Sequence, residues 1–360
     1  MIRMKNSLLI AGSACVVLAL SSCSKSSSNP DSEEGNWVKR GQFDGAARTA
    51  AVSFVINETA YVGTGYNVNA KDAAGLVEKG FMKDFWKFNI PTDGSGNYYW
   101  TQVATFPGVH RSDAVGFNIG NKGFVGTGVS SNKTTLLRDF WEFDGQTWTQ
   151  RADYPNTARK NAVGFGLNGK GYITTGLDEN GAYQKDLAMY DTTTKTWTNN
   201  LPTLGGDKRS GAIALVHGNK AYILGGSAGG SVSTDMFEFD GTKWTEKEKV
   251  YNAKDDSFDD DYGSAGSSTG IARTFGVGFV IGDYGYVTTG SVGAYNSQTW
   301  RYDFALDRWV IRTAYERTAR SSGVGFAVKG RGFIGLGESG SSYLDNFDEF
   351  LPNETYSSTD

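Results

Sequence analysis

Cysteine and histidine are scarce in this sequence, and an excess of positive charge is missing. The chain of 360 residues has two Cys, of which Cys15 lies in an apolar run near the N-terminus. If that run is removed as a targeting segment, one thiol remains, and it cannot form an internal disulfide. With only two His, no Ser-His-Asp or Cys-His arrangement can be recognised. The formal net charge of −4 argues against nucleic-acid binding.

Long helix-periodic stretches rich in Ala, Leu, Glu and Lys are also absent. In their place are short β-branched and aromatic runs separated by Gly, Asn, Asp and Ser. Glycine is abundant at 48 residues, and aromatic residues make up 13% of the chain. This mixture is typical of an all-β protein with many tight turns.

Residues 1–22 have the features of a targeting segment. Arg3 and Lys5 precede the apolar run LLIAGSACVVLAL, which is too short to span a bilayer comfortably. The run leads into LSSC, which resembles the lipobox of bacterial lipoproteins. In such proteins the Cys, here Cys23, is lipidated and becomes the new N-terminus. An ordinary secretory signal peptide with an incidental Cys is the alternative.

Residues 23–35 follow as a polar segment that we expect to be a flexible tether. Several acyl chains on Cys23 would anchor the protein stably in a membrane. The residue after the Cys is Ser24 rather than Asp, which by resemblance to lipoprotein sorting signals favours the outer membrane. We therefore expect an outer-membrane lipoprotein of the bacterial cell envelope, either periplasmic or exposed at the cell surface.

The remaining residues, 36–360, are dominated by an internal repeat. Copies such as RSDAVGFNIGNKGFVGTG align on an Arg that precedes a small, apolar strand. Each copy continues through an aromatic strand such as DFWEFD, and a further strand begins near a Trp. Four short antiparallel strands in about 50 residues are the pattern of a β-propeller blade. The repeated arginines are Arg48, Arg111, Arg159, Arg209, Arg273 and Arg320.

This combination of features resembles the kelch motif: an Arg before the first strand, a Gly after the second, an aromatic third strand and a spaced Trp. The resemblance covers residues 37–350. It implies a kelch-type β-propeller, related to galactose oxidase, with four antiparallel strands in each blade. Kelch blades usually carry a Gly-Gly doublet, which this chain has in full only at Gly225 and Gly226.

The fourth strands predict how the ring closes. The copy that starts at Arg320 ends without a Trp, whereas the other five copies each have one, at Trp100, Trp148, Trp197, Trp244 and Trp309. A fourth-strand sequence without a blade of its own, NWVKRGQF, stands at the start of the domain. We therefore expect six blades, with the segment from Trp37 to Phe43 completing the last blade and removing an exposed sheet edge.

The six arginines are the candidate ligand-binding residues. They fall in the loops that join one blade to the next, so they should lie at one mouth of the central channel. The kelch resemblance implies that arginines at this position line a pocket for acidic peptides, and six guanidinium groups would make a local positive site. The alternative is structural, because each Arg could bond loop carbonyls or a neighbouring carboxylate. An Asp begins the third strand in five copies and could be that partner, whereas the fifth copy has Gln298 there. The five aspartates are Asp84, Asp139, Asp186, Asp235 and Asp345.

Two insertions interrupt the repeat, residues 67–83 in the first copy and residues 251–270 between the fourth and fifth. Loops of this length are often functional or disordered. The second insertion is rich in Asp, but its spacing does not match an EF-hand and no bidentate Glu follows. We expect a solvated acidic loop rather than a calcium site, and we expect no metal and no cofactor.

Catalysis has little support in the sequence. His110 and His217 belong to no recognisable catalytic arrangement. A copper radical oxidase of related fold needs a Tyr–Cys crosslink, and no Cys lies within the domain. A sialic acid mutarotase of related fold needs only acid–base side chains and an Arg, so composition does not exclude it. The residues Glu58, Glu179 and Glu338 lie near turns and are expected to be solvated.

These features together predict a lipid-anchored binding module of the cell envelope, more a binder than an enzyme. The expected partner is an acidic molecule, a carbohydrate or a protein loop, held at the Arg-lined mouth of the channel, and the membrane is contacted through the N-terminal lipid. A sugar isomerase that uses the same channel and a structural scaffold are the two alternatives.

Overall fold

The computed structural model describes residues 34–71, 74–91, 96–250 and 270–359. These residues form 35 β-strands and no helix, so the all-β prediction is confirmed. In this part of the chain there is accordingly no helix with the length and hydropathy to cross a membrane. The targeting segment, Cys23, the tether up to residue 33 and the acidic insertion up to residue 269 lie outside the described residues.

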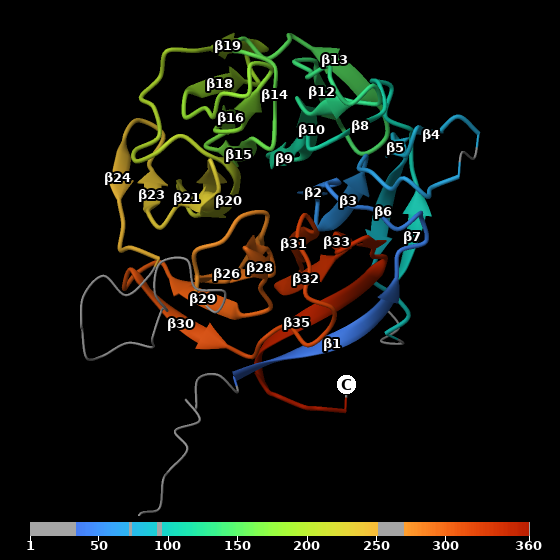
Figure 1. Ribbon diagram of the computed structural model, residues 1–360, viewed down its shortest axis with the longest axis vertical. Coiled ribbons are helices and arrows are strands. Elements are labelled where there is room, and N and C mark those ends of the chain that lie inside the picture. Colours follow the sequence, from blue (N-terminus) through green and yellow to red (C-terminus); the bar gives the residue numbers. More distant parts are fainter. Residues whose placement is uncertain (1–33, 72–73, 92–95, 251–269, 360) are drawn as a thin grey trace, which may run out of the picture.

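Six sheets of the described chain share one strand order and stand in a propeller-like ring (Figure 1). In each sheet, neighbouring strands are antiparallel and follow one another from the centre of the ring to its rim. We number the sheets 1 to 6 from the N-terminal side of the chain. Their innermost strands are β2 (Val52–Ile56), β9 (Val115–Ile119), β15 (Val163–Leu167), β20 (Ser210–His217), β25 (Val277–Ile281) and β31 (Val324–Val328).

Three further strands complete each sheet. The second strands are β3 (Thr59–Gly63), β10 (Lys122–Gly126), β16 (Lys170–Thr174), β21 (Lys220–Ala228), β26 (Tyr284–Thr288) and β32 (Arg331–Gly335). The third strands are β6 (Phe85–Asn89), β12 (Phe140–Phe143), β18 (Leu187–Asp191), β23 (Met236–Phe239), β29 (Thr299–Asp303) and β35 (Asn346–Thr355). The outermost strands are β7 (Tyr99–Gln102), β13 (Trp148–Arg151), β19 (Thr196–Thr198), β24 (Trp244–Glu246), β30 (Arg308–Arg312) and β1 (Glu34–Gln42).

Short strands decorate the loops. One additional sheet has the order β11 (Val129–Ser130), β8 (Arg111–Ser112), β5 (Phe81–Met82) and β4 (Val77–Glu78). Three two-stranded pairs join β14 (Arg159–Lys160) to β17 (Leu177–Asp178), β27 (Ser291–Val292) to β28 (Ala294–Tyr295), and β33 (Glu338–Ser339) to β34 (Ser342–Tyr343). The strand β22 (Ser231–Val232) extends sheet 4 by pairing with β21.

The innermost strands form a closed cycle. Each contacts the innermost strand of the next sheet, and β31 of sheet 6 contacts β2 of sheet 1. Small residues make this approach possible. A Cβ atom added to Gly164 would lie 2.4 Å from the Phe117 ring, and one added to Gly325 would lie 2.0 Å from Val277. Glycine is therefore required at these two positions because a neighbouring strand occupies the space of a side chain.

Aromatic side chains fill the spaces between adjacent sheets. The Phe54 ring of sheet 1 lies 6.3 Å from Phe143 and 6.4 Å from Trp148 of sheet 2. On the other side of sheet 1, Phe88 lies 5.0 Å from Phe333 of sheet 6. Buried clusters of this kind make up the core. A single four-stranded sheet cannot bury its own faces, so the fold depends on contact between neighbouring sheets.

The first and last long strands of the domain pair with each other. The strand β1 is antiparallel to β35, with Trp37 opposite Phe350. The Trp37 side chain is fully buried, its indole N–H donates to the Thr313 carbonyl at 3.1 Å, and its ring lies 4.8 Å from Phe350. The expected pairing of the orphan segment is confirmed. The strand begins at Glu34, inside the predicted tether, and ends just before Phe43.

A second closure runs around the channel and involves the residue two positions after each repeated Arg. Each of these residues donates its backbone N–H to the carbonyl of its counterpart in the preceding sheet, over distances between 2.8 and 3.1 Å. The bond from Ala50 to Ser322 completes the cycle between sheets 1 and 6. We call this set the inner belt, and all six members have positive φ: Ala50, Asp113, Asn161, Gly211, Phe275 and Ser322.

Candidate functional site

The repeated arginines lie beneath the surface, and Arg48 shows the common arrangement. Its side chain is fully buried. The guanidinium donates in bidentate fashion to Asp84, with Nη1–Oδ1 and Nη2–Oδ2 distances of 2.6 and 2.8 Å. It also donates to the carbonyls of Ala46 at 2.9 Å and Thr64 at 3.0 Å. This pattern satisfies most of the guanidinium donors and joins three loops of sheet 1.

The same arrangement recurs in the next three sheets. Each Arg is fully buried, donates to the Asp at the start of the third strand, and donates to the carbonyl 16 residues further along the chain. The ion pairs are Arg111–Asp139, Arg159–Asp186 and Arg209–Asp235. The structural alternative for these arginines is therefore what the geometry favours.

Sheets 5 and 6 differ in the group that meets the Arg. In sheet 5 the guanidinium of Arg273 donates to backbone carbonyls, including that of Gln298 at 2.9 Å, and burial lowers its pKa. In sheet 6 the partner of Arg320 is the side-chain oxygen of Asn346, at 2.8 Å. The prediction that Asp345 would be this partner is wrong by one residue.

The burial of the arginines changes their expected role. A ligand at the channel mouth could reach these guanidinium groups only if the loops above them opened, because each side chain is at most 1% exposed. Their donors are committed to protein oxygens. The geometry thus corrects the interpretation of a pocket lined by arginines: these six residues hold the loops that shape the mouth.

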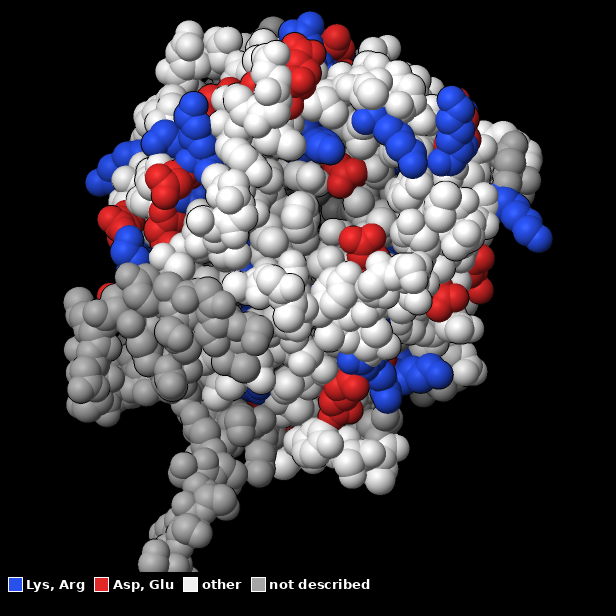
Figure 2. Space-filling view, viewed as in Figure 1, with Lys and Arg blue, Asp and Glu red and all other residues white. Residues whose placement is uncertain are grey.

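The mouth itself is formed by the inner belt and the residue that follows each of its members. Together they line a cavity of about 170 Å³. It continues into a space of about 250 Å³ between the innermost strands of the six sheets. Figure 2 shows one face of the ring with a hollow at its centre and acidic side chains beside that hollow. The chemistry of this mouth is set by which side chain each sheet places in the belt.

Two half-buried carboxyl groups lie at the mouth. Burial raises the pKa of Asp113, an effect that the Ser112 hydroxyl and the charge of Lys160 offset only in part. Burial and then the negative charge of Asp113 raise the pKa of Glu338. The expectation of a solvated Glu338 is therefore wrong. Carboxyl groups with raised pKa values beside a cavity are typical of functional sites.

Phe275 is the one large apolar side chain of the inner belt. Its φ is 54°, a left-handed conformation that is rare for a bulky residue. The neighbouring belt residue is Gly211, and a Cβ atom there would lie 2.9 Å from the Phe275 ring. The ring therefore lies against the Gly211 backbone at the mouth. Such strain is retained at sites where the surrounding structure fixes a side chain for a purpose.

Tyrosines stand beside the belt at sheets 1 and 6. The Tyr66 backbone pairs with Thr49, and its ring lies 4.8 Å from Phe81 and 6.0 Å from Tyr343. The ammonium group of Lys133, from sheet 2, lies 3.1 Å from the Tyr66 hydroxyl. Aromatic rings, hydroxyl groups and a cation thus gather around Tyr66, whose backbone pairs with the residue before Ala50 of the belt.

The first insertion lies on the same face as the arginines, because its strand β5 pairs with β8. His110 contacts this insertion, with Nε2 3.0 Å from the Gly75 carbonyl and Nδ1 3.3 Å from the Glu78 carboxylate. His217 is the last residue of β20, the innermost strand of sheet 4, and its ring stacks on Phe304. The two histidines are thus separate, and the described residues contain no cluster of three or more His, Cys, Asp or Glu side chains able to hold a metal.

The ring of antiparallel sheets defines the class: an all-β protein of propeller-like architecture. No protein-family model matches the chain, and no curated protein does. Among solved structures, YjhT has a similar fold, with a TM-score of 0.63 and 16% identity over 84% of this chain and 94% of YjhT. At this identity the likeness shows the fold alone.

The sequence contains a signal for the mouth residues at the position two residues after each repeated Arg. Positions that follow each Arg by two residues differ in every copy, as Ala, Asp, Asn, Gly, Phe or Ser. A repeat position that must face a neighbouring sheet is restricted in size, whereas one that faces a channel is not. The varied position was therefore the better candidate for ligand contact than the invariant one.

Proposed function

We propose that this chain is a six-bladed, kelch-type propeller that acts as a lipid-anchored binding module of the bacterial cell envelope. The six repeated sheets, the pairing of β1 with β35 and the closed inner belt support this architecture. The LSSC motif at Cys23, which follows a charged and then an apolar segment, supports the lipid anchor.

The ligand we propose is a neutral, polyhydroxylated molecule of the carbohydrate class. One observation carries this choice: the mouth groups Asp113, Asn161 and Ser322 around the Phe275 ring. Carboxyl, amide and hydroxyl groups exchange hydrogen bonds with sugar hydroxyls, and an aromatic ring covers the apolar face of a sugar. An acidic ligand is less favoured, because the arginines are buried and two carboxyl groups lie at the mouth.

A glycan array followed by calorimetry on the best binders tests this assignment. Phe275→Ala and Asn161→Ala should each weaken binding by roughly tenfold, the loss of about one good contact. Ala50 occupies the same belt position in sheet 1, so the backbone tolerates Ala there. His217→Ala, far from the belt, is the control and should leave the affinity unchanged. Binding that ignores both belt substitutions would exclude this mouth.

The lipid anchor has a separate test. Cys23→Ser should move the protein from the membrane fraction to the soluble fraction and abolish incorporation of labelled fatty acid. Membrane association that persists in this variant would contradict the proposal, and it would leave the binding function untouched.

Sugar isomerisation at the same mouth is the second candidate. The raised pKa values of Asp113 and Glu338 favour it, since a carboxyl group poised nearer neutral pH can donate and accept a proton. Exchange between anomers of a bound sugar can be followed by nuclear magnetic resonance. Asp113→Asn should abolish the exchange while preserving binding if the site is catalytic.

A further inference from the structure

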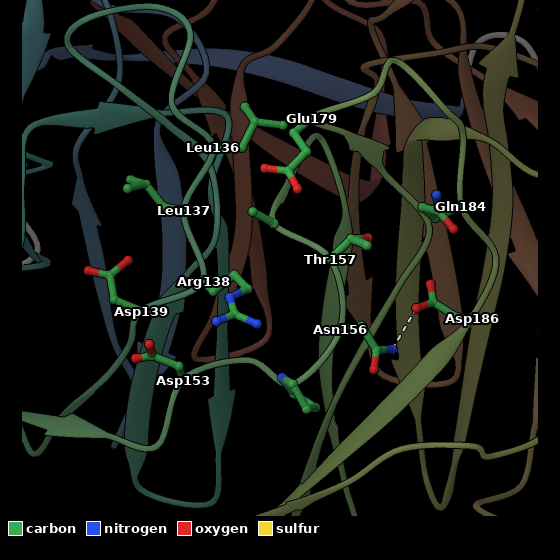
Figure 3. Close-up of a pocket in the computed structure, with 12 residues that line it drawn as sticks. Leu136, Leu137, Arg138, Asp139, Asp153, Asn156, Thr157, Glu179, Gln184 and Asp186 are labelled. Atoms are coloured by element: carbon green, nitrogen blue, oxygen red, sulfur yellow. Dashed lines mark hydrogen bonds between the residues drawn. The ribbon is translucent and has the colours of Figure 1, made fainter.

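A separate groove of about 820 Å³ lies between sheets 2 and 3 (Figure 3). Its walls are residues 136–139 from the loop before β12, residues 153 and 155–158 from the connection to β14, and three residues of the loop before β18. It shares no lining residue with the mouth. Its size falls within the range of small-molecule sites, roughly 300–1,000 Å³.

In sheets 1 and 2 a tryptophan occupies the corresponding position beside the Arg–Asp ion pair. The indole N–H of Trp86 donates to Asp84 at 2.7 Å, and that of Trp141 donates to Asp139 at 2.8 Å. The Asp84 side chain is 9% exposed and the Asp139 side chain 21%. In both sheets the Trp partly covers the carboxylate.

Sheet 3 lacks this cover. The residue two positions after Asp186 is Ala188, and the Asp186 side chain is 33% exposed, the highest value among the four ion-paired aspartates. The indole donor is replaced by the amide of Asn156, which reaches Asp186 from the facing segment (Figure 3). Sheet 3 therefore lacks the large side chain that stands beside the carboxylate in sheets 1 and 2.

Sheet 3 also differs in a buried hydroxyl group, that of Tyr154. Tyr154 is fully buried, and its neighbours in sequence, Asp153 and Pro155, line the groove. Its hydroxyl has no hydrogen-bond partner among the described residues. In sheet 6 the equivalent hydroxyl, that of Tyr315, donates to Asp348 at 2.6 Å. Asp348 stands at the position that Ala188 fills in sheet 3. An unpaired hydroxyl in a buried place is costly and points to a missing partner.

Three charged side chains line the groove without an ion-pair partner among the described residues. They are Arg138, Asp153 and Glu179. Figure 3 shows that Arg138 and Glu179 come from facing loops and extend into the same space. Because Asp139 and Asp186 are neutralised by their own arginines, the charge available to a ligand is one guanidinium and two carboxylates.

We propose that this groove is a second binding site, for a small zwitterion that carries an additional amine, of which lysine is the simplest. The guanidinium of Arg138 receives the ligand carboxylate, and Asp153 and Glu179 receive its two ammonium groups. The end of the groove beside Asp186 accommodates the apolar part of the ligand. This site is independent of the proposed function at the mouth.

Calorimetric titration of the intact protein with L-lysine, cadaverine and sorbitol tests the proposal. Lysine should bind more tightly than cadaverine, which lacks the carboxylate, and sorbitol should not bind. Arg138→Gln should weaken the affinity for lysine by roughly tenfold or more, because a charge-assisted hydrogen bond is lost, and should leave the affinity for cadaverine unchanged. Glu179→Gln should weaken the affinity for both lysine and cadaverine. Both substitutions lie on exposed loops and should leave the melting temperature unaltered.

Ala188→Trp closes the groove by restoring the side chain present in sheets 1 and 2, and should abolish binding of both amines. His217→Ala, which lines neither the groove nor the mouth, is the control and should leave the binding of both amines unchanged. The proposal is overturned if Arg138→Gln affects lysine and cadaverine equally or not at all. It is also overturned if a folded Ala188→Trp variant still binds lysine, or if sorbitol binds as well as lysine.

Discussion

Asp84, beside Arg48, and Asp113, at the channel mouth, have pKa values that are shifted in opposite directions. Burial alone would raise the pKa of Asp84, but the charge and hydrogen bonds of Arg48 outweigh it and hold that pKa below its usual value. Asp113 follows Arg111 by two residues, and its pKa is raised because burial dominates there. One ring thus holds carboxylates that are fully paired and carboxyl groups that are not.

This difference separates structural charges from functional ones. An ion pair that satisfies all its donors holds loops together and leaves nothing for a ligand. A carboxyl group that lies beside a cavity, with a nearby cation that only partly offsets its burial, is a cost that folding alone does not explain. Sheet 5 gives a third arrangement, because Arg273 is fully buried and, among the described residues, donates to carbonyl oxygens alone.

The largest expected effect is that of breaking a pair in the first group. Asp84→Ala leaves the guanidinium of Arg48 buried without its counter-ion, and should lower the free energy of unfolding by about 3–5 kcal/mol. Urea denaturation followed by tryptophan fluorescence measures this loss. The control is Gln298→Ala at the same repeat position, where Arg273 uses the backbone carbonyl and not the side chain.

The control Gln298→Ala should lower the free energy of unfolding by no more than about 0.5 kcal/mol, as is usual for a side chain outside any buried network. Equal losses in the two variants would mean that the third-strand position matters for packing, and that the ion pair does not.

The contribution of the Arg48–Asp84 pair to stability should also be measurable in the unaltered protein, from the fall in its free energy of unfolding at low pH. The folded-state pKa of Asp84 is lowered, so its contribution to stability is present above the unfolded value of about 3.9 and is lost as the pH falls through the folded value. Below about pH 4 the free energy of unfolding should therefore decline, and it should decline less steeply in Asp84→Ala. Parallel declines in the two proteins would assign the acid sensitivity to other carboxylates.

Much of the ring was predictable because its physical causes are local in the sequence. Strand order followed from the spacing of apolar runs, turns and Trp residues. The pairing of the N-terminal strand with the last sheet could be predicted from the number of Trp residues, because the last copy lacks a Trp and Trp37 belongs to no other copy. Small residues in the innermost strands followed from crowding at the axis, as Gly164 and Gly325 illustrate.

The site was harder to predict, because burial is a property of the assembled ring. An Arg in a loop is expected at the surface, and only the meeting of three loops places Arg48 out of reach of solvent. The groove between sheets 2 and 3 depends on a side chain that is absent, Ala188 in place of Trp. An alignment of the repeat copies on their shared residues gives little weight to a position where one copy has a small residue in place of a Trp.

Removing the charge of Asp113 should raise the free energy of unfolding, whereas breaking the Arg48–Asp84 ion pair should lower it. The raised folded-state pKa of Asp113 means that its ionised form opposes folding at neutral pH, and stability rises as the pH falls through that value. Asp113→Asn removes the charge and retains an oxygen that can accept from Ser112. We expect a gain of about 1 kcal/mol at pH 7, in the range seen when functional sites are relieved of strain. A loss of stability would place Asp113 among the structural charges.

The smallest expected effect comes from giving sheet 5 the carboxylate that sheet 1 has. Gln298→Asp offers Arg273 an acidic partner at the position of Asp84, and Gln298→Asn is the neutral control of the same shape. Because the new carboxylate loses hydration when it pairs, most of the attraction is offset, and we expect a net gain of about 0.5 kcal/mol at pH 7. The gain should vanish in acid, where the carboxyl group is protonated. Stabilisation that persists in acid, or that Gln298→Asn reproduces, would show that shape and not charge distinguishes the two sheets.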